Sequence, residues 1–472
     1  MFGQGRPGTG NFLWDPGLTE QVVVEAVSSF VGPTTIDTIL ARTAKHEQRV
    51  RRLPAPMVVW LVIGIGLFNH LDMVAIWRQI VGTLRVLYLA LTLYKPPSKS
   101  TLSQARQRLT ARPLRQLFLE TSKPMATDRT RGAFYKGMRL MAIDGTRLDV
   151  PDTKANAKAF GRPTTKRNDE VVAGAYPQIL AVCLDEIGTH MIYEAVVKSY
   201  RGNEYAAGSY LLEKTPSGSL VLWDKGFYGY SHIQQAKEQG KELLARVPSH
   251  VVFERVRDLP DGSYLANIYP TTTDKKRGTN GLLVRVIDYT FDDPGRPGHA
   301  ERHRLVTTLL DAETFPAEEL IVLYHERWEI EIGYDELKTH QLGQWIHLRS
   351  RTPVGVIQEL YGLFIAYNAV RHSMHEAALA IDLDPRRLSF IHAVRVIRDT
   401  VPLMRRARTM ELPTLYAAMI ALIGQGVLPP RDNRINPRVI KRKMSNFAKK
   451  RPEHRSCPQP QKRFHEGIVM LT

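Results

Sequence analysis

Cysteine is scarce in this sequence of 472 residues, in which Cys183 and Cys457 are the only two. Two cysteines cannot form a disulfide framework or a cysteine-based zinc site. Long apolar segments are lacking too, since the longest runs from Met57 to Phe68 and a membrane-spanning helix needs about 20 residues. The first residues, MFGQGRPGTGNFLW, show no pattern of a secretory signal. These absences predict a protein of the reducing cytoplasm, without a membrane partner.

Acidic residues are outnumbered by basic ones. The sequence has 65 Lys and Arg against 47 Asp and Glu, which gives a net charge of +18 and a pI near 9.8. Such an excess favours a polyanionic partner, and we expect nucleic acid. Half of the excess lies after residue 430, where twelve Lys or Arg stand against three acidic residues. This basic tail predicts salt-sensitive binding to DNA of any sequence, with a disordered, solubilising end as the alternative.

Short apolar runs in the middle of the chain predict an α/β sheet. The expected strands are Met138–Ile143, Gln178–Leu184, Met191–Val197, Leu220–Trp223 and Glu242–Val247, and the expected helices between them are Asn203–Lys214 and Tyr230–Gln239. Three strands followed by a helix, a strand, a helix and a strand are the order of a ribonuclease-H-like core. In such sheets ligands gather at the carboxyl ends of strands. Asp144 and Asp224 stand at two of these ends.

The rest of the chain divides around this core. Short β-type runs at Val251–Glu254 and Leu282–Tyr289 indicate a β-rich insertion, and helical patterns dominate both ends. The basic segment Thr101–Phe118 looks like a helix-turn-helix DNA-binding region, or else a basic helix packed on its neighbours. We therefore expect a helical N-terminal DNA-binding domain (1–125), the first part of the core (126–247), the insertion (248–303), the second part of the core (304–400) and a helical, basic C-terminal region for DNA binding or dimerisation (401–472).

A charged stretch late in the core, YHERWEIEIGYDELK, combines groups that suit a phosphodiester. Read as one α-helix, it places Tyr324, Arg327, Glu331 and Lys338 within an arc of about 60°. The carboxylate can hold a divalent metal while the other three side chains grip phosphate oxygens. The alternative is a solvated helix face with ion pairs such as Arg327 with Glu331. An aspartate followed by glycine, as at Asp144, is likewise often an ordinary turn.

The spacing of Tyr, Arg, Glu and Lys in this stretch resembles the signature of the insertion sequence 4 family of bacterial DDE transposases. Two earlier segments are similar to the family's other catalytic blocks, namely IDGTRLDVPDTKANAKAFGRP and VLWDKGFYGY. Further resemblance lies in RRLPAPMVVWLVIGIGLF near the N-terminus and in IHLRSRTPVGVIQELYGLFIAYNAVR after the glutamate. The resemblance implies that Asp144, Asp224 and Glu331 are the catalytic, metal-binding carboxylates.

The resemblance further implies a metal-dependent DNA enzyme. Such a transposase cuts the ends of an insertion sequence and joins the freed 3′-hydroxyl ends to target DNA. Three carboxylates fit Mg²⁺, with Mn²⁺ as a substitute and two ions per site. By the same resemblance, Tyr324, Arg327 and Lys338 bind DNA. The implied partners are double-stranded DNA and a second copy of the chain, which would form a homodimer at the nucleoid in the cytoplasm.

Two other functions fit the same sequence. A catalytically inactive relic or inhibitor would bind DNA ends through its basic surfaces, and a nuclease of the same fold would cut without joining. In related members of the family a base is flipped onto an aromatic side chain, and Trp328 or Tyr289 could receive it here. For Trp328, however, we expect the role of a buried core anchor.

Overall fold

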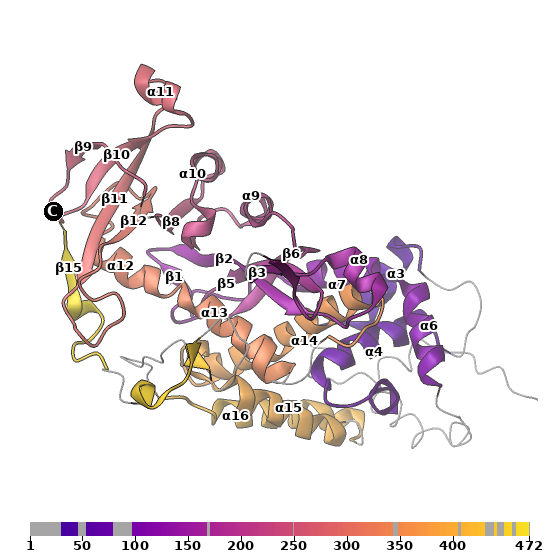
Figure 1. Ribbon diagram of the computed structural model, residues 1–472. Coiled ribbons are helices and arrows are strands. Elements are labelled where there is room, and N and C mark those ends of the chain that lie inside the picture. The colour runs from indigo at the N-terminus through magenta and orange to yellow at the C-terminus, as the bar shows by residue number, and fades with distance from the viewer. Residues whose placement is uncertain are drawn as a thin grey trace, which may run out of the picture.

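The computed structural model describes residues 30–45, 53–78, 97–167, 170–248, 250–342, 348–404, 407–429, 439–440, 448–455 and 459–471. An 11-stranded sheet runs through the molecule, with helices on both of its faces (Figure 1). Within these ranges, every helix is too short or too polar to traverse a lipid bilayer.

Five strands form the part of the sheet that the sequence predicts as the core. They are β2 (Met138–Asp149), β5 (Gln178–Glu186), β6 (Met191–Ser199), β7 (Ser219–Trp223) and β8 (Glu242–Arg246). Their order is β6-β5-β2-β7-β8, in which β2, β7 and β8 run parallel and β5 runs antiparallel to both of its neighbours, β2 and β6. Helix α9 (Glu204–Lys214) connects β6 to β7, and α10 (Tyr230–Glu238) connects β7 to β8. This is the ribonuclease-H-like arrangement, so the predicted fold class is confirmed.

Alternating side chains of these strands pack into two separate cores. Ile143 and Val221 belong to the core beneath α9 and α10. Their neighbours Ala142 and Leu222 belong to the core shared with α14 (Pro353–Ala380). Because successive residues of a strand point to opposite faces, a sheet covered on both faces requires the nearly continuous apolar runs seen in the sequence.

The predicted strands and helices of the core match the observed ones closely, with one exception. We predicted that the first strand ends at Ile143, but β2 continues to Asp149 because it stays paired with β5 up to Gln178. Asp144 therefore lies within a strand and not after it. The parallel pairing of β2 with β7 does end at Ile143 and Trp223, so β2 parts from this neighbour at Asp144.

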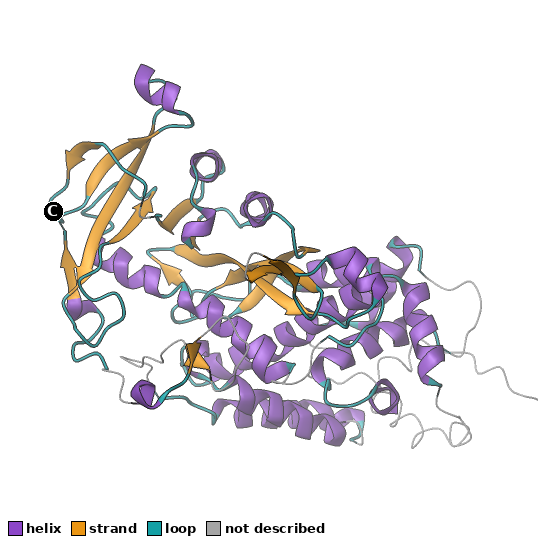
Figure 2. Cartoon of the chain, in the orientation of Figure 1, coloured by secondary structure: helices purple, strands orange, loops and turns teal. Residues whose placement is uncertain are grey.

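The insertion is rich in strands, as predicted. Its strands are β9 (Arg255–Asp258), β10 (Tyr264–Ile268) and β11 (Leu282–Phe291), and together with β12 (His303–Thr307), which begins where the insertion ends, they extend the sheet beyond β8. Helix α11 (Thr272–Arg277) stands at the far tip (Figure 1 and Figure 2). The predicted strand at Val251–Glu254 is wrong, since these residues form a loop before β9. Near the C-terminus, β15 (Ile468–Met470) pairs with β11, which the sequence did not indicate.

Most of the remaining helices gather around α14. From the N-terminal part come α3 (Pro33–Arg42), α4 (Ala55–Leu67), α6 (Lys99–Leu109) and α7 (Arg112–Thr121), and from the C-terminal part come α15 (Phe390–Met404) and α16 (Leu412–Gly424). Helix α15 passes through Pro402 and ends at Met404. Smaller elements are β1 (Phe134–Tyr135), α8 (Lys154–Phe160), β3 (Thr164–Arg167), β4 (Glu170–Ala173), β13 (Val439–Ile440) and β14 (Ala448–Lys449).

The basic segment Thr101–Phe118 forms the two helices α6 and α7, which are separated at Thr110, where φ is +63°. Arg106 of this segment is buried. Its guanidinium donates hydrogen bonds to Gln358 Oε1 (3.3 Å) and to the backbone carbonyl of Gly355 (2.9 Å). For Arg106 the alternative of a basic helix packed on its neighbours is therefore correct, and this side chain is not exposed to DNA.

Helix α4 crosses α14 at a contact between two glycines, Gly66 and Gly362. A Cβ atom at Gly362 would lie 2.6 Å from the backbone oxygen of Val62, and one at Gly66 would lie 2.7 Å from that of Gly362. Because backbone atoms cannot move aside like the end of a side chain, we expect Gly362→Ala to lower stability by about 1–3 kcal/mol.

Calorimetric melting of the Gly362→Ala variant measures this loss. Gly424→Ala in α16 is the control, since a Cβ atom there meets Ile381 at 3.8 Å, an ordinary contact distance, and alanine favours a helix. An unchanged melting temperature for Gly362→Ala would contradict the close crossing of α4 and α14.

Candidate active site

Asp144 and Asp224 lie close together where the parallel pairing of the central strands β2 and β7 ends. The parallel pairing of β2 with β7 aligns Ile143 with Trp223, so the next residue on each strand is one of the two aspartates. Asp224 precedes a short 3-10 turn. Asp144 accepts a hydrogen bond from the backbone N–H of Gly145 (2.8 Å). Strand register thus brings together two carboxylates that are distant in the sequence.

The charged stretch Tyr324–Lys338 is helical, but it is not the single α-helix that we predicted. It comprises the end of α12 (Ala317–His325), α13 (Trp328–Asp335) and the start of a π-helix, η3 (Glu336–Gln341). We refer to residues 324–341 as the site helix.

The winding of the site helix changes twice. At the first junction the N–H of Arg327 bonds to a carbonyl only three residues back, that of Tyr324. After η3, the N–H of Leu342 reaches five residues back, to Leu337. The helix is therefore tightened before α13 and widened after it, compared with the four-residue spacing of a regular α-helix.

Arg327 links the site helix to the sheet. Its Nη2 donates to Glu331 Oε1 (3.0 Å), and its Nη1 lies 3.9 Å from Asp144 Oδ2. Burial lowers the pKa of Arg327, but Tyr324, Asp224, Asp144 and Glu331 outweigh burial and raise it. Two of the predicted carboxylates, Asp144 and Glu331, thus lie beside this guanidinium, and Asp224 lies within its electrostatic reach.

The carboxylates of this site repel one another. Burial raises the pKa of Asp144 to about 6, and the charges of Glu331 and Asp224 add to the rise, against the opposing effects of Gly145 N–H and Arg327. In the described part of the chain, no three His, Cys, Asp or Glu side chains stand close enough to share an ion. Arg327 supplies positive charge beside Asp144 and Glu331. Because carboxylate oxygens are the preferred ligands of hard divalent ions, the donor set fits a metal that takes over this neutralising role.

Tyr324 and Lys338 are both half-buried. The hydroxyl of Tyr324 donates to the backbone carbonyl of Trp223 (3.0 Å), directly before Asp224, and burial raises the pKa of Tyr324. Burial lowers the pKa of Lys338, against the opposing effect of Asp144 and other groups nearby. Lys338 thus lies within electrostatic reach of Asp144, whereas Tyr324 is bonded to the end of a strand.

Tyr334 is a site residue that the sequence analysis missed. From α13, its hydroxyl donates to the backbone carbonyl of Asp144 (2.7 Å). Together with the bond from Tyr324 to Trp223, this bond lets the site helix hold the backbone next to both aspartates. A signal was available, because Tyr334 comes three residues after Glu331 and such residues are neighbours on a helix surface.

Trp328 is not the buried anchor that we expected. It is 42% exposed, whereas Tyr289 is 6% exposed and packs against Phe291 and His303. Of the two aromatic residues considered for a flipped base, Trp328 is the accessible one.

Two family profiles and one relative match most of this chain. The profile described as "Transposase DDE domain" matches residues 135–369, and the profile described as "Insertion element 4 transposase N-terminal" matches residues 21–119. The chain is 30% identical to the transposase InsG for insertion sequence element IS4 of Escherichia coli (strain K12), over 88% of this chain and 91% of that protein. A solved piggyBac transposase synaptic complex with hairpin DNA aligns with 89% of this chain and 86% of that chain, at 14% identity and a TM-score of 0.40.

Proposed function

This chain belongs to the insertion sequence 4 family of DDE transposases, and we propose that Asp144, Asp224 and Glu331 are its catalytic carboxylates. It is a DNA-cleaving and strand-transfer enzyme, and its family uses divalent metal ions. The proposal is carried by the convergence of these side chains, from two strands and a helix, around the guanidinium of Arg327.

The proposed reaction is cleavage at the ends of an insertion sequence followed by transfer of the 3′-hydroxyl ends into target DNA. We propose Mg²⁺ as the physiological ion, with Mn²⁺ as a substitute and two ions per site. Asp144, Asp224 and Glu331 would hold these ions, which activate the attacking oxygen and stabilise the leaving one when bound. Ligands must be deprotonated to bind a metal, and a pKa of about 6 leaves Asp144 mostly ionised at neutral pH.

Arg327, Lys338 and Tyr324 are the proposed DNA contacts. In the protein alone, Arg327 neutralises Asp144 and Glu331. Once a metal takes over this role, the guanidinium is released for a phosphate, which its planar fork of donors fits well. Lys338 would hold the DNA backbone close to the cut. Tyr324 can donate to a phosphate only if its hydroxyl leaves the carbonyl of Trp223, so in the protein alone it holds the end of the strand.

The family implies DNA as the partner, and we propose the element ends and a target duplex as its two forms. Both ends of the element must be held together during the reaction, so we propose a homodimer on DNA. We propose that this complex acts at the nucleoid in the cytoplasm. The N-terminal domain (1–125) would serve DNA binding, and the C-terminal region (401–472) would serve DNA binding or dimerisation, around the core (126–247 and 304–400) and its insertion (248–303).

A duplex that carries the ends of the element tests this function. We expect the purified protein to cut it in Mg²⁺ or Mn²⁺, to remain inactive in EDTA, and to join the 3′ ends to a target plasmid, because both steps depend on the metal. Gel electrophoresis of end-labelled DNA measures each product. Cutting without joining would favour the nuclease, and salt-sensitive binding without cutting would favour the relic. Cleavage that persists in EDTA would contradict the metal-binding role of the carboxylates.

A further inference from the structure

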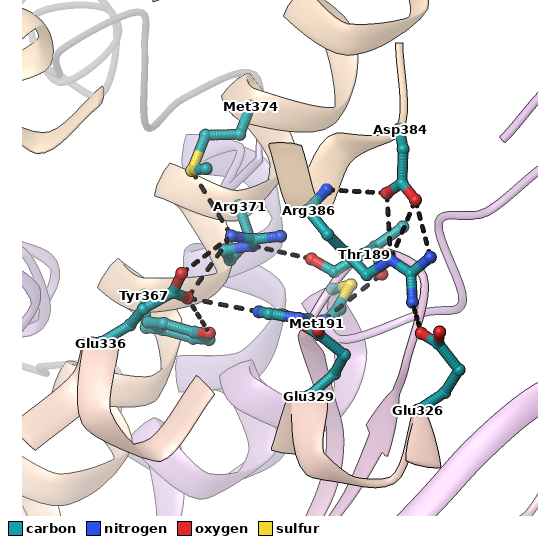
Figure 3. A network of polar contacts seen from close by, with 11 residues as sticks. Thr189, Met191, Glu326, Glu329, Glu336, Tyr367, Arg371, Met374, Asp384 and Arg386 are labelled. Carbon is teal, nitrogen blue, oxygen red and sulfur yellow. Dashed lines mark hydrogen bonds and ion pairs between the residues drawn. The ribbon is translucent and has the colours of Figure 1, made fainter. Parts of the chain in front are cut away.

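Two carboxylates lie on the side of the site helix that faces away from Glu331. At 100° per residue, Glu329 points about 160° away from Glu331, and Glu336 follows two turns later on the same side as Glu329. Both contact His190, whose Nε2 is 2.9 Å from Glu329 Oε2 and whose Nδ1 is 3.4 Å from Glu336 Oε2. Figure 3 shows Glu329 and Glu336 among the groups that surround them. The site helix thus has a reactive face and an anchored face.

His190 reaches the helix from the turn between β5 and β6. Its backbone φ is +57°, a left-handed conformation that is unfavourable for a residue with a side chain. The turn is also held from α14, because Arg371 Nε donates to the backbone carbonyl of Thr189 (2.7 Å). Such a conformation persists only where the surrounding contacts offset its cost.

Glu336 is the centre of the anchored face. It is buried, accepts a hydrogen bond from the hydroxyl of Tyr367 (2.9 Å) and lies 3.4 Å from Arg371 Nη1 (Figure 3). Burial raises the pKa of Glu336, but Arg371, His190 and Tyr367 outweigh burial and hold this pKa below its usual value. The Arg371 side chain is itself 1% exposed, so removal of either partner leaves an uncompensated buried charge.

Glu336 also marks the point at which the winding changes. It is the first residue of the π-helix that carries Lys338. A π-helical turn is wider than an α-helical one, so its extent sets the direction in which Lys338 points relative to Glu331. Two of the residues that contact Glu336, Tyr367 and Arg371, belong to α14, and this helix packs on the sheet. Tyr367 and Arg371 therefore hold the site helix at Glu336. The rotation of the helix at this point determines how Lys338 is oriented relative to Glu331.

We propose that His190, Glu336 and Arg371 are positioning residues that fix the rotation of the site helix and thereby hold Glu331 and Lys338 towards Asp144. This role rests on the proposed assignment of Glu331 and needs no contact of the cluster with DNA or metal. The competing role is stabilisation of the fold alone. Loss of a purely stabilising cluster would reduce the amount of folded protein without changing the rate of the chemical step.

Single-turnover cleavage of the end duplex in Mg²⁺ separates the two roles. With DNA in excess over protein, the amplitude of the first turnover reports the fraction of competent protein. With protein in excess over DNA, the rate constant reports the cleavage step. We expect Glu336→Gln and Arg371→Met each to lower the rate constant about tenfold or more, because small displacements of reacting groups strongly reduce the rate of a reaction. Affinity for the end duplex should be retained. The double variant should be no slower than the slower single variant, because the two residues act as one unit.

Two further variants serve as controls. Asp288 in β11 also has a buried carboxylate, which accepts hydrogen bonds from Arg304 of β12 (2.6 Å) and from Arg302 (2.7 Å). Asp288→Asn should lower the melting temperature and the amplitude but leave the rate constant unchanged. Tyr367→Phe removes one hydrogen bond to Glu336 and keeps the ring, so it provides a milder variant, with an expected fall in the rate constant of about threefold.

Wild-type rate constants in Glu336→Gln and Tyr367→Phe, with only the amplitudes reduced, would overturn the positioning role. Glu331→Gln, run in parallel, identifies which idea has failed. If Glu331→Gln cuts normally, the catalytic assignment is wrong. If Glu331→Gln is inactive while Glu336→Gln keeps the wild-type rate constant, only the positioning role is wrong.

Discussion

Glutamine in place of Glu331 should reduce the rate of end cleavage by about a thousandfold, the effect expected when a site loses a group that stabilises the transition state. The amide oxygen can still accept the hydrogen bond from Arg327 Nη2, which spans 3.0 Å in the native protein, so the local structure should persist. What is lost is the negative charge with which a carboxylate holds a divalent ion. Nicking of a labelled duplex in Mg²⁺ measures the rate.

Asp335 on the same helix provides the matched control for Glu331. Its side chain is 60% exposed and accepts a hydrogen bond from Thr339 (2.6 Å). Asp335→Asn removes the same charge by the same chemical change and should cut at the wild-type rate. Comparable losses in both variants would show that the helix tolerates no loss of negative charge at all, and the assignment of Glu331 would then have no support. Both variants should still bind end DNA, because neither removes a basic group.

The core strands could be predicted because burial on both faces requires runs of apolar residues. The end of β2 could not, since its pairing with β5 continues beyond Asp144 up to Asp149, and strand pairing involves residues far apart in the sequence. The order of strands and helices was nevertheless sufficient to predict where the two aspartates of the site lie. It placed Asp144 and Asp224 at the ends of two apolar runs, and the register of β2 and β7, whose pairing ends at Ile143 and Trp223, brings these two positions together.

The site helix shows where helical periodicity is insufficient. Periodicity placed Arg327 and Glu331 together, and these side chains do form the expected pair. It gave no indication of the π-helical winding that begins at Glu336, because the partners that hold this residue come from elsewhere. His190 lies 146 residues earlier in the chain, and Arg371 lies 35 residues later. A buried arginine such as Arg371 is also indistinguishable from an exposed one in a count of basic residues.

Asparagine in place of Asp144 should abolish cleavage and at the same time stabilise the metal-free protein. Burial raises the pKa of Asp144 from its usual 3.8 to about 6. Between these two values the folded protein binds more protons than the unfolded chain, so stability falls as the pH rises, and the full penalty is present above the folded pKa. The penalty is on the order of 3 kcal/mol. Asparagine removes it because the amide stays neutral.

Thermal unfolding of the Asp144→Asn variant and the wild type in EDTA measures this penalty. At about pH 7.5 the variant should melt at the higher temperature, and the gap should shrink as the pH falls from about 6 towards 4, where the wild-type carboxylate becomes protonated. Mg²⁺ should then stabilise the wild type and not the variant, because an ion that binds only the native site shifts the equilibrium by mass action. A variant that melts below the wild type at neutral pH would contradict the buried, mutually repelling carboxylates. The excess stability of the variant would therefore measure how strongly the metal-free site disfavours the negative charge of Asp144. This unfavourable charge is also what makes a cation bind there.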